Sequence, residues 1–230
     1  MKNENNSWNN LNTRILNCST CPRLVVWREF ISKKKRKSYR DQTYWGKPVL
    51  GFGDRKARLL IIGLAPGAHG SNRTGRMFTG DASGDFLYPA LYKAGFSNQP
   101  SSSHSRDGLE LNDVFITAVC RCVPPKNRPN KSEIKNCASY LISEINLLEK
   151  LQGIVALGQI AYEVIIGIYT DFFGVKISPR KKFGHQNILS IKNMPWVLSS
   201  YHPRLQNTAT GRLNEEMFDD IWSYAKNILI

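Results

Sequence analysis

The chain has 230 residues, 41% of them hydrophobic, which is enough to bury a core and excludes a disordered chain. Its 32 Lys and Arg outnumber 18 Asp and Glu, and the formal net charge of +14 favours a polyanionic partner, most commonly nucleic acid. No stretch approaches the roughly 18 consecutive apolar residues of a membrane span, and the polar start lacks the apolar segment of a signal peptide. We therefore expect a cytoplasmic protein with no membrane partner.

Short apolar runs alternate with segments of helical periodicity along the chain. The runs predict strands at 58–64, 114–119, 153–158 and 194–199. Helices are expected at 24–30, 81–94, 131–151, 159–168 and 214–229. This alternation is typical of a mainly parallel sheet with helices on both faces. The fold class we expect is α/β, as one three-layer domain over residues 1–230.

A glycine-rich segment, residues 63–81, follows the first predicted strand directly. Glycines allow tight turns and close approach of the backbone, so such a loop can surround a small planar or anionic group with N–H donors. The segment matches neither a phosphate-binding P-loop nor the dinucleotide fingerprint. Polar and charged residues lie among its glycines: His69, Asn72, Arg73, Arg76 and Asp81. We interpret it as a functional loop at a strand end.

The five cysteines are spaced for a metal site rather than for disulfides in an intracellular chain. Cys18 and Cys21 form a C-x2-C pair, whereas Cys122 and Cys137 are separated by a proline-rich segment. Zinc ribbons usually show two short pairs, so the spacing disfavours zinc without excluding it, and four thiolates also suit an iron–sulfur cluster. Cys120 competes with Cys122 as the third ligand.

Three motifs in this sequence resemble those of one enzyme family. Residues 63–81 read GLAPGAHGSNRTGRMFTGD, residues 122–129 read CVPPKNRP, and residues 201–213 read YHPRLQNTATGRL. Together with the Cys18/Cys21 pair they resemble the family 5 uracil-DNA glycosylases, over roughly residues 15 to 225. The resemblance implies a monofunctional glycosylase that removes uracil from DNA in base-excision repair, by base flipping and N-glycosidic hydrolysis.

The resemblance also implies a [4Fe–4S] cluster held by Cys18, Cys21, Cys122 and Cys137. Cys122 is preferred because Cys-x-Pro-Pro is the form that the family motif takes, which leaves Cys120 as a core thiol. We expect the cluster to be structural and to tie the N-terminal segment 1–30 to the core.

Glycosidic cleavage develops positive charge on the sugar and negative charge on the base. By resemblance, Asp81 is the catalytic carboxylate, although it is also a plausible helix N-cap; Asp85 is the reserve candidate. His202 is expected to donate to a base carbonyl. Asn127 resembles a position tied to catalysis or base contact, but its sequence context also fits an ordinary turn.

The expected base pocket consists of Gly63, Leu64, Ala65, Pro66, Gly67, Phe78 and Ala118. Phe78 would stack on the flipped base. Ala65 stands where better-known superfamily members carry a water-activating Asp or Asn. Ala118 stands where we expect Asn in the related family 4, which suggests a roomier pocket that also accepts hypoxanthine or xanthine.

Two groups of residues are expected to contact the DNA. Arg73, Arg76, Lys126, Arg128 and Arg212 would contact phosphates. Leu205, Gln206 and Asn207 belong to the loop that enters the duplex in the family and fills the gap left by the flipped base. The basic run at residues 33–37 reads mainly as a solvated loop, with phosphate contact as the less favoured alternative.

The expected partner is DNA containing deaminated bases, bound by a monomer. Two alternatives stay open at this point. One is a non-catalytic iron–sulfur protein that binds nucleic acid, and the other is a different hydrolase or transferase on the same α/β scaffold.

Overall fold

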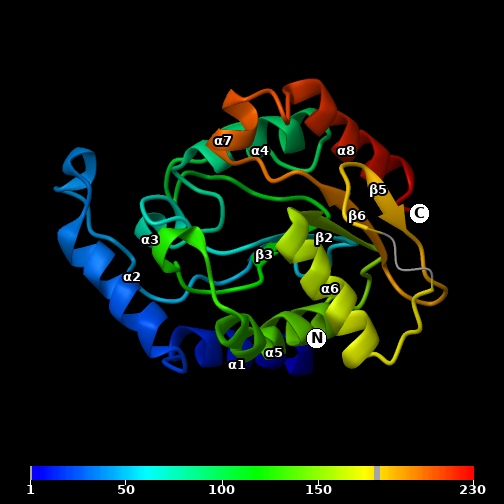
Figure 1. The fold of residues 1–230 in the computed structure, drawn as a ribbon, viewed down its shortest axis with the longest axis horizontal. Coiled ribbons are helices and arrows are strands. Elements are labelled where there is room, and N and C mark those ends of the chain that lie inside the picture. The colour runs from blue at the N-terminus through cyan, green and yellow to red at the C-terminus, as the bar shows by residue number, and fades with distance from the viewer. Residues whose placement is uncertain (1, 179–181) are drawn as a thin grey trace.

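The computed structural model describes residues 2–178 and 182–230. Its centre is a six-stranded sheet with the strand order β1-β3-β2-β4-β6-β5 (Figure 1). The strands are β1 (Phe52–Gly53), β2 (Leu59–Gly63), β3 (Val114–Ala118), β4 (Gly153–Leu157), β5 (Asn187–Leu189) and β6 (Trp196–Ser200). The four inner strands run parallel and coincide with the four predicted strands. The edge strands β1 and β5 pair antiparallel and were not predicted, since two or three residues leave no periodic pattern.

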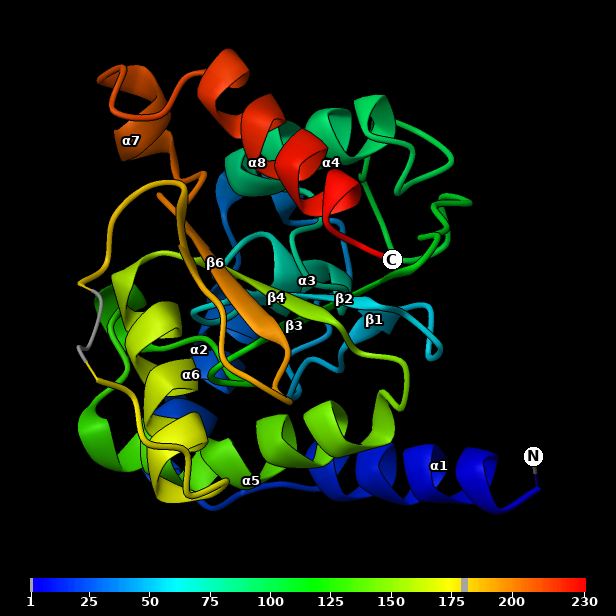
Figure 2. The ribbon, with the colours of Figure 1, turned by 90° about the vertical axis from the view of Figure 1, so that its right-hand side faces the viewer.

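Helices cover both faces of the sheet, as predicted (Figure 2). They are α1 (Lys2–Leu16), α2 (Pro22–Lys34), α3 (Ser71–Thr74), α4 (Ala82–Lys93), α5 (Lys131–Leu147), α6 (Gln159–Asp171), α7 (Leu205–Ala209) and α8 (Glu215–Asn227), with short 3-10 turns η1 (Lys37–Tyr39) and η2 (Pro125–Asn127). Helices α4 and α8 lie on one face, and α1, α5 and α6 lie on the other. Among the helices in these two stretches of chain, none is long and apolar enough to cross a membrane.

The strands are buried on both faces because each side of the sheet carries its own apolar core. In β2, Leu59 and Ile61 belong to the core beneath α4 and α8, while Leu60 and Ile62 belong to the opposite core. Alternate residues of a strand point to opposite faces, so a strand between two cores is apolar at nearly every position. The continuous apolar run in the sequence is explained by this arrangement.

Helix α1 was not predicted, because its Asn-rich composition was interpreted only as a polar start. Its signal is nevertheless present: Trp8, Leu11 and Ile15 follow the i, i+3, i+7 spacing of one helix face, and all three are buried against the core that includes α5. The helix predicted at 131–151 is shorter than expected and ends at Leu147.

A buried ion pair fixes the chain that leaves β3. The Arg121 guanidinium donates to the Glu144 carboxylate of α5 at 2.5 Å, and both side chains are 1% exposed. Thr117 donates its hydroxyl to the same carboxylate. Removal of one partner from such a pair leaves an uncompensated buried charge. The pair therefore holds the segment that carries Cys120 and Cys122 against α5.

Candidate active site and cysteine cluster

The loops that carry the predicted motifs leave the same edge of the sheet. Strands β2, β3, β4 and β6 are parallel, so their carboxyl ends lie side by side. Gly63, the last residue of β2, is in register with Ala118, the last residue of β3. The ladder continues into the loops, since the Val119 amide donates to the Gly63 carbonyl at 2.9 Å. The expected pocket residues Gly63 and Ala118 are thus direct neighbours.

Asp81 lies at the end of the glycine-rich loop and caps helix α4. Its Oδ1 accepts hydrogen bonds from the amides of Ser83 at 3.1 Å and Gly84 at 3.2 Å. Its Oδ2 lies against the loop itself: a Cβ on Gly67 would come within 2.7 Å of Oδ2, and one on Gly70 would come closer still. One carboxylate therefore serves as the cap while its second oxygen fills a cradle that only glycines allow. The structure thus shows the N-cap that the sequence offered as the alternative role, and the cap uses only one of the two carboxylate oxygens.

The environment of Asp81 opposes its charge. Burial raises the pKa of this carboxyl above its ordinary value, against the lowering effect of the Gly84 and Ser83 amides. The nearby Asp85 carboxylate raises the pKa further, and the Arg73 guanidinium lowers it. Asp85 itself is exposed on the first turn of α4. A carboxylate kept from water in this way interacts strongly with any cationic group placed beside it.

Phe78 adopts a backbone conformation that is costly for a bulky residue. Its φ is 51°, in the left-handed region, and its side chain is buried. The ring packs over the end of β2, where a Cβ on Gly63 would lie 2.7 Å from the ring. Its centroid is 5.9 Å from that of the His202 ring, with the planes inclined by 31°. Strained residues of this kind concentrate at functional sites.

His202 follows β6 by two residues, and it is half-buried. Burial, together with the Arg204 cation, lowers the pKa of His202 to about 4, so the ring is neutral at neutral pH. Its Nδ1 is buried without a hydrogen-bond partner in the described structure. Its carbonyl accepts from the Asn207 side chain at 2.9 Å and the Arg204 amide at 2.8 Å. The sequence predicted a histidine at the rim of the sheet, and the structure places a half-buried histidine at that edge.

The loop after β3 is strained and exposed. Lys126 and Asn127 both have positive φ, at 55° and 54°, and their side chains are exposed together with that of Arg128. The amide of Asn127 closes the turn on Pro124 at 3.2 Å. Two consecutive left-handed residues are typical of the centre of a type I′ turn, where Asn is common and Lys is strained. The structure therefore presents Asn127 on a distinct surface loop rather than packed against Asp81 or His202.

The expectation that Arg73 and Arg76 contact phosphates is corrected by their burial. Arg76 is 5% exposed, and its guanidinium pairs with Asp107 at 2.7 Å and with the hydroxyls of Ser102 and Thr79. Arg73 is 8% exposed and donates to the carbonyls of His69 and Gly80 and to the Gln42 side chain. Both guanidinium groups therefore form hydrogen bonds within the protein. Their glycine-rich sequence context suggested a ligand loop but did not indicate these partners.

Asn207 is likewise an internal residue, since it is 7% exposed and binds the His202 carbonyl. Its neighbour Leu205, at the start of α7, is 66% exposed, and Gln206 and Arg212 are exposed as well. The Arg212 guanidinium lies 4.6 Å above the Tyr201 ring. Of the predicted DNA-facing residues, those with accessible side chains are Lys126, Arg128, Leu205, Gln206 and Arg212.

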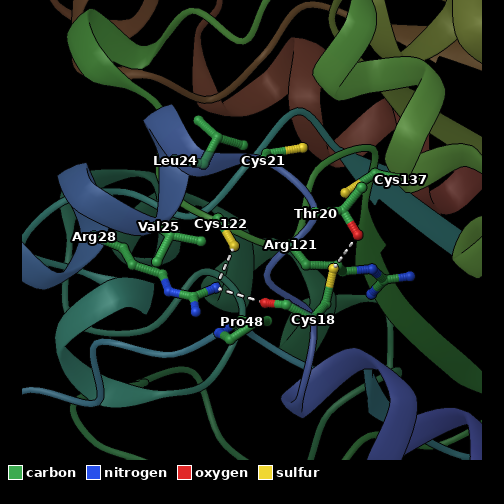
Figure 3. A pocket seen from close by; sticks show the side chains of 10 residues that line it. All are labelled: Cys18, Thr20, Cys21, Leu24, Val25, Arg28, Pro48, Arg121, Cys122 and Cys137. Carbon is green, nitrogen blue, oxygen red and sulfur yellow. Dashed lines mark hydrogen bonds between the residues drawn. The ribbon is translucent and has the colours of Figure 1, made fainter.

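Four cysteines from distant parts of the chain line one cavity. Cys18 and Cys21 precede α2, Cys122 follows β3, and Cys137 lies in α5 (Figure 3). The cavity among these side chains is small and partly open to solvent. Within the described residues, no group of three or more His, Cys, Asp or Glu side chains could hold a single metal ion. A larger group, with several atoms between the thiolates, fits four cysteines that share a cavity but do not converge on one point.

Cys120 is excluded from this cavity. It is fully buried in the core, and its hydrogen bond to Cys137 together with burial raises the pKa of its thiol. The same hydrogen bond lowers the pKa of Cys137, with help from the Arg121 amide and charge. The hydrogen bond therefore favours the protonated form of Cys120 and makes Cys137 the more acidic of the two thiols. The choice of Cys122 over Cys120 as a lining residue is consistent with this placement.

Arg28 of α2 provides a second indication of an anionic occupant. Its side chain is buried, donates to the Cys122 sulfur at 2.9 Å and to the Cys18 carbonyl at 3.3 Å, and leaves Nε without a partner (Figure 3). No carboxylate of the described residues forms an ion pair with it. A buried cation without a counter-ion is costly. Four thiolates and the group they hold would supply the missing negative charge, so the residues present fit an iron–sulfur cluster.

Comparisons with known proteins agree with these observations. Residues 50–226 match the model of the Uracil DNA glycosylase superfamily. A type-5 uracil-DNA glycosylase of Mycobacterium tuberculosis is 47% identical over 95% of this chain and 80% of its own length. Type-5 uracil-DNA glycosylases of Thermus thermophilus (48% identical; 92% of this chain, 93% of the relative) and Pyrobaculum aerophilum (41%; 90% and 87%) are also similar.

The chain belongs to the uracil DNA glycosylase superfamily. The superfamily model begins at residue 50, after the first cysteine pair. The match to the Mycobacterium relative covers 95% of the chain and therefore extends over Cys18 and Cys21. The N-terminal segment is thus part of what this chain shares with a type-5 uracil-DNA glycosylase, and so are the loops that carry Asp81 and His202.

The capping hydrogen bonds of Asp81 and the charge of its carboxylate can be tested separately by substitution. The side-chain amide of an Asp81→Asn variant keeps an oxygen for the cap, whereas Asp81→Ala removes it, so we expect the Ala variant to be about 1 kcal/mol less stable than the Asn variant. Because the folded pKa of Asp81 is raised, the wild-type carboxyl favours the folded state at acidic pH and loses that contribution as pH rises through its pKa. Asp81→Asn should therefore gain stability relative to wild type between acidic and neutral pH.

The measurement is denaturant unfolding of the three proteins at both pH values. An Asn variant less stable than wild type at neutral pH would show that the charge stabilises the fold, against the environment described above.

Proposed function

We propose that this protein is a monofunctional DNA glycosylase that removes uracil from DNA by flipping the base out and hydrolysing its N-glycosidic bond. The observation that carries the proposal is the Asp81 carboxylate, held in a glycine cradle at the edge of the sheet where Phe78 and His202 pack together. Its relatives carry the name uracil-DNA glycosylase. The protein acts as a monomer in this proposal.

The base is held by groups that favour its departure as an anion. The Phe78 ring offers a stacking surface, and the backbone of Gly63, Leu64, Ala65, Pro66 and Gly67 forms the wall beside it. His202 is neutral, and a neutral imidazole can donate its single N–H to a base carbonyl. A preorganised donor in a site closed to water stabilises negative charge as it develops there.

Asp81 is the group that stabilises the positive charge that develops on the sugar. Between residues 63 and 81 it is the one acidic residue, and Ala65 has no group with which to activate water. A carboxylate that is already desolvated in the ground state stabilises an oxocarbenium-like sugar more strongly than an exposed one would. The second oxygen, Oδ2, is free of the capping hydrogen bonds and is the one that can orient a water molecule. Asn127 can take part in the reaction only if its loop moves toward the site when DNA binds.

The first experiment measures cleavage of a duplex with a single deoxyuridine, with alkaline scission of the product. We expect wild type to produce an abasic site that breaks only after alkali, and Asp81→Asn to slow single-turnover cleavage by about 100-fold or more, because the cap remains while the charge is lost. Asp85→Asn is the matched control and should retain activity. A wild-type protein that binds the duplex but cuts none of the deaminated bases would favour the non-catalytic binding protein.

We further propose that the pocket accepts hypoxanthine or xanthine besides uracil. Ala118 is 1% exposed and lies beside Gly63 at the base of the site, among the residues that pack with Phe78. The methyl group of Ala118 cannot form a hydrogen bond with the edge of the base. Without an amide to match, the pocket discriminates by shape alone, which separates similar bases weakly.

An amide at position 118 should narrow the range of bases. We expect Ala118→Asn to lower cleavage of hypoxanthine relative to uracil by about tenfold or more, since the larger purine loses space and the amide matches a pyrimidine edge. Ala118→Val adds similar bulk without an amide and serves as the control for volume. The ratio of single-turnover rates on the two bases is the measurement. An Asn variant with equal loss on both bases would contradict this role.

The exposed residues around the site are placed for DNA contact. In this proposal Lys126, Arg128 and Arg212 bind phosphates, and Leu205 and Gln206 enter the gap left by the flipped base. A large apolar side chain that is 66% exposed three residues after His202 has no packing role in the free protein. Insertion between stacked bases would bury it.

We propose that Cys18, Cys21, Cys122 and Cys137 hold a [4Fe–4S] cluster with a structural role. When bound, the cluster cross-links the N-terminal segment to the loop after β3 and to α5. The protein already aligns these parts, since Arg23 of α2 donates two hydrogen bonds to Glu133 of α5 at 2.7 and 2.6 Å. Arg28 supplies a charged hydrogen bond to one ligand sulfur. Hydrogen bonds of this kind tune such clusters.

Two cysteine variants distinguish ligand from core thiol. Cys122→Ala should lose iron, sulfide and the visible absorbance of the cluster and should melt at a lower temperature, because one covalent anchor is gone. Cys120→Ala should retain full iron content and lose only the small packing contribution of a buried thiol. Iron and sulfide analysis with thermal melting measures both. The opposite pattern, with iron lost in the Cys120 variant, would reassign the third ligand.

A further inference from the structure

A basic segment begins in the last turn of α2, continues beyond the helix and lies outside every contact assigned so far. It contains six cations within eight residues: Lys33, Lys34, Lys35, Arg36, Lys37 and Arg40. Five of them have exposed side chains, and Lys35 is half-buried with its ammonium on the Arg40 carbonyl. None of the ion pairs found in residues 2–178 and 182–230 involves this segment. The cations are therefore available to an external polyanion.

Hydrogen bonds attach the chain after this segment to the glycine-rich loop, residues 63–81. The Tyr44 hydroxyl is 3.0 Å from Nδ1 of His69, and the amides of Trp45 and Gly46 donate to the carbonyls of Arg73 and Asn72. In Figure 1, α2 and the chain after it form an arm beside α3, which belongs to the same glycine-rich loop. The chain that continues from the basic segment is thus packed against the glycine-rich loop that ends in Asp81.

The buried Arg73 explains how this attachment is made. Its guanidinium lies 4.0 Å above the Tyr39 ring and donates to the Gln42 side chain at 2.6 Å, while its other nitrogen atoms bind the catalytic loop. One of those loop acceptors is the carbonyl of Gly80, next to Asp81. Arg73 therefore joins the basic segment to the catalytic carboxylate instead of contacting DNA itself.

Partly exposed aromatic rings accompany the cations. Trp45 is 38% exposed with the Lys47 ammonium 5.8 Å from its ring, and Phe30 is 44% exposed with the Lys34 ammonium 5.4 Å away. Phe30 stacks on Trp27 at 5.6 Å. Cations interleaved with exposed rings are typical of surfaces that follow a nucleic-acid strand, where phosphates meet the charges and sugars or unstacked bases meet the rings.

We propose that residues 33–47 form a phosphate-binding element that grips the DNA backbone beside the flipped nucleotide. The inference rests on the proposed function, because the continuity with the Asp81 loop identifies the polyanion as the substrate strand. The exposed lysines supply the contacts that the buried Arg73 and Arg76 do not. The element determines the affinity for DNA and the position of the bound strand, and it takes no part in the chemical step at Asp81.

The test compares two triple variants with equal charge loss. Lys33, Lys34 and Lys37 are replaced by Ala in one, and the exposed Lys56, Lys150 and Lys192, which precede β2, β4 and β6 at the opposite edge of the sheet, are replaced by Ala in the other. Binding to a duplex with a tetrahydrofuran abasic analogue is measured across a range of salt concentrations. Removal of one phosphate-binding cation lowers the slope of log K against log[salt] by about 0.9, so the slope of the first variant should fall by up to about 2.7.

The control variant should keep the wild-type slope, and both variants should keep the wild-type single-turnover rate on deoxyuridine at saturating enzyme. Equal slopes for the two triple variants would overturn the phosphate-binding element while wild-type cleavage stands. A wild type that neither binds nor cleaves would instead overturn the proposed function. A first variant with normal binding but slowed chemistry would assign the segment to the catalytic step and would also contradict the inference.

Discussion

The parallel register of β2, β3, β4 and β6 is the constraint on which the site depends. It brings residues separated by more than a hundred positions to one edge of the sheet, with Gly63 beside Ala118 and with the chain toward His202 leaving β6 at the same edge. The register is itself fixed by two apolar cores, because a shift by one residue would exchange the faces of every strand. The apolar side chains that stabilise the fold therefore also determine which loops meet.

Within this edge, the protein holds several groups in states that are unfavourable for folding. Asp81 is a carboxylate whose burial opposes its charge, Phe78 has a left-handed backbone, and His202 has a ring nitrogen without a partner among the described residues. Each is compensated by neighbours that have no chemical role, such as the α4 amides that cap Asp81 and the Asn207 amide that fixes the chain at His202. These three groups therefore lower the stability of the fold locally, and the residues around them compensate for that loss.

The sequence predicted the inner strands and most of the long helices because their apolar periodicity is a local property. It also predicted the four cysteines that line one cavity, although from resemblance rather than from spacing alone. It could not predict β1 or β5, which exist only through pairing, nor the burial of Arg73 and Arg76. An arginine in a glycine-rich loop has the same local pattern whether it faces DNA or pairs with Asp107 across a fold. Helix α1 was missed for a different reason, since composition was weighed above the spacing of Trp8, Leu11 and Ile15.

The cations of this chain divide into two sets with different physical roles. Arg28, Arg73, Arg76 and Arg121 are buried, and their planar guanidinium groups join segments that are distant in sequence: α2 to Cys122, the chain after α2 to the Asp81 loop, that loop to Asp107, and the end of β3 to α5. The exposed cations are mostly lysines, whose hydrated ammonium groups suit mobile contacts with phosphate. A net charge of +14 therefore does not measure DNA affinity directly. The buried arginines hold segments of the chain in place, and Arg73 joins the chain after α2, which carries exposed lysines, to the loop that ends in Asp81.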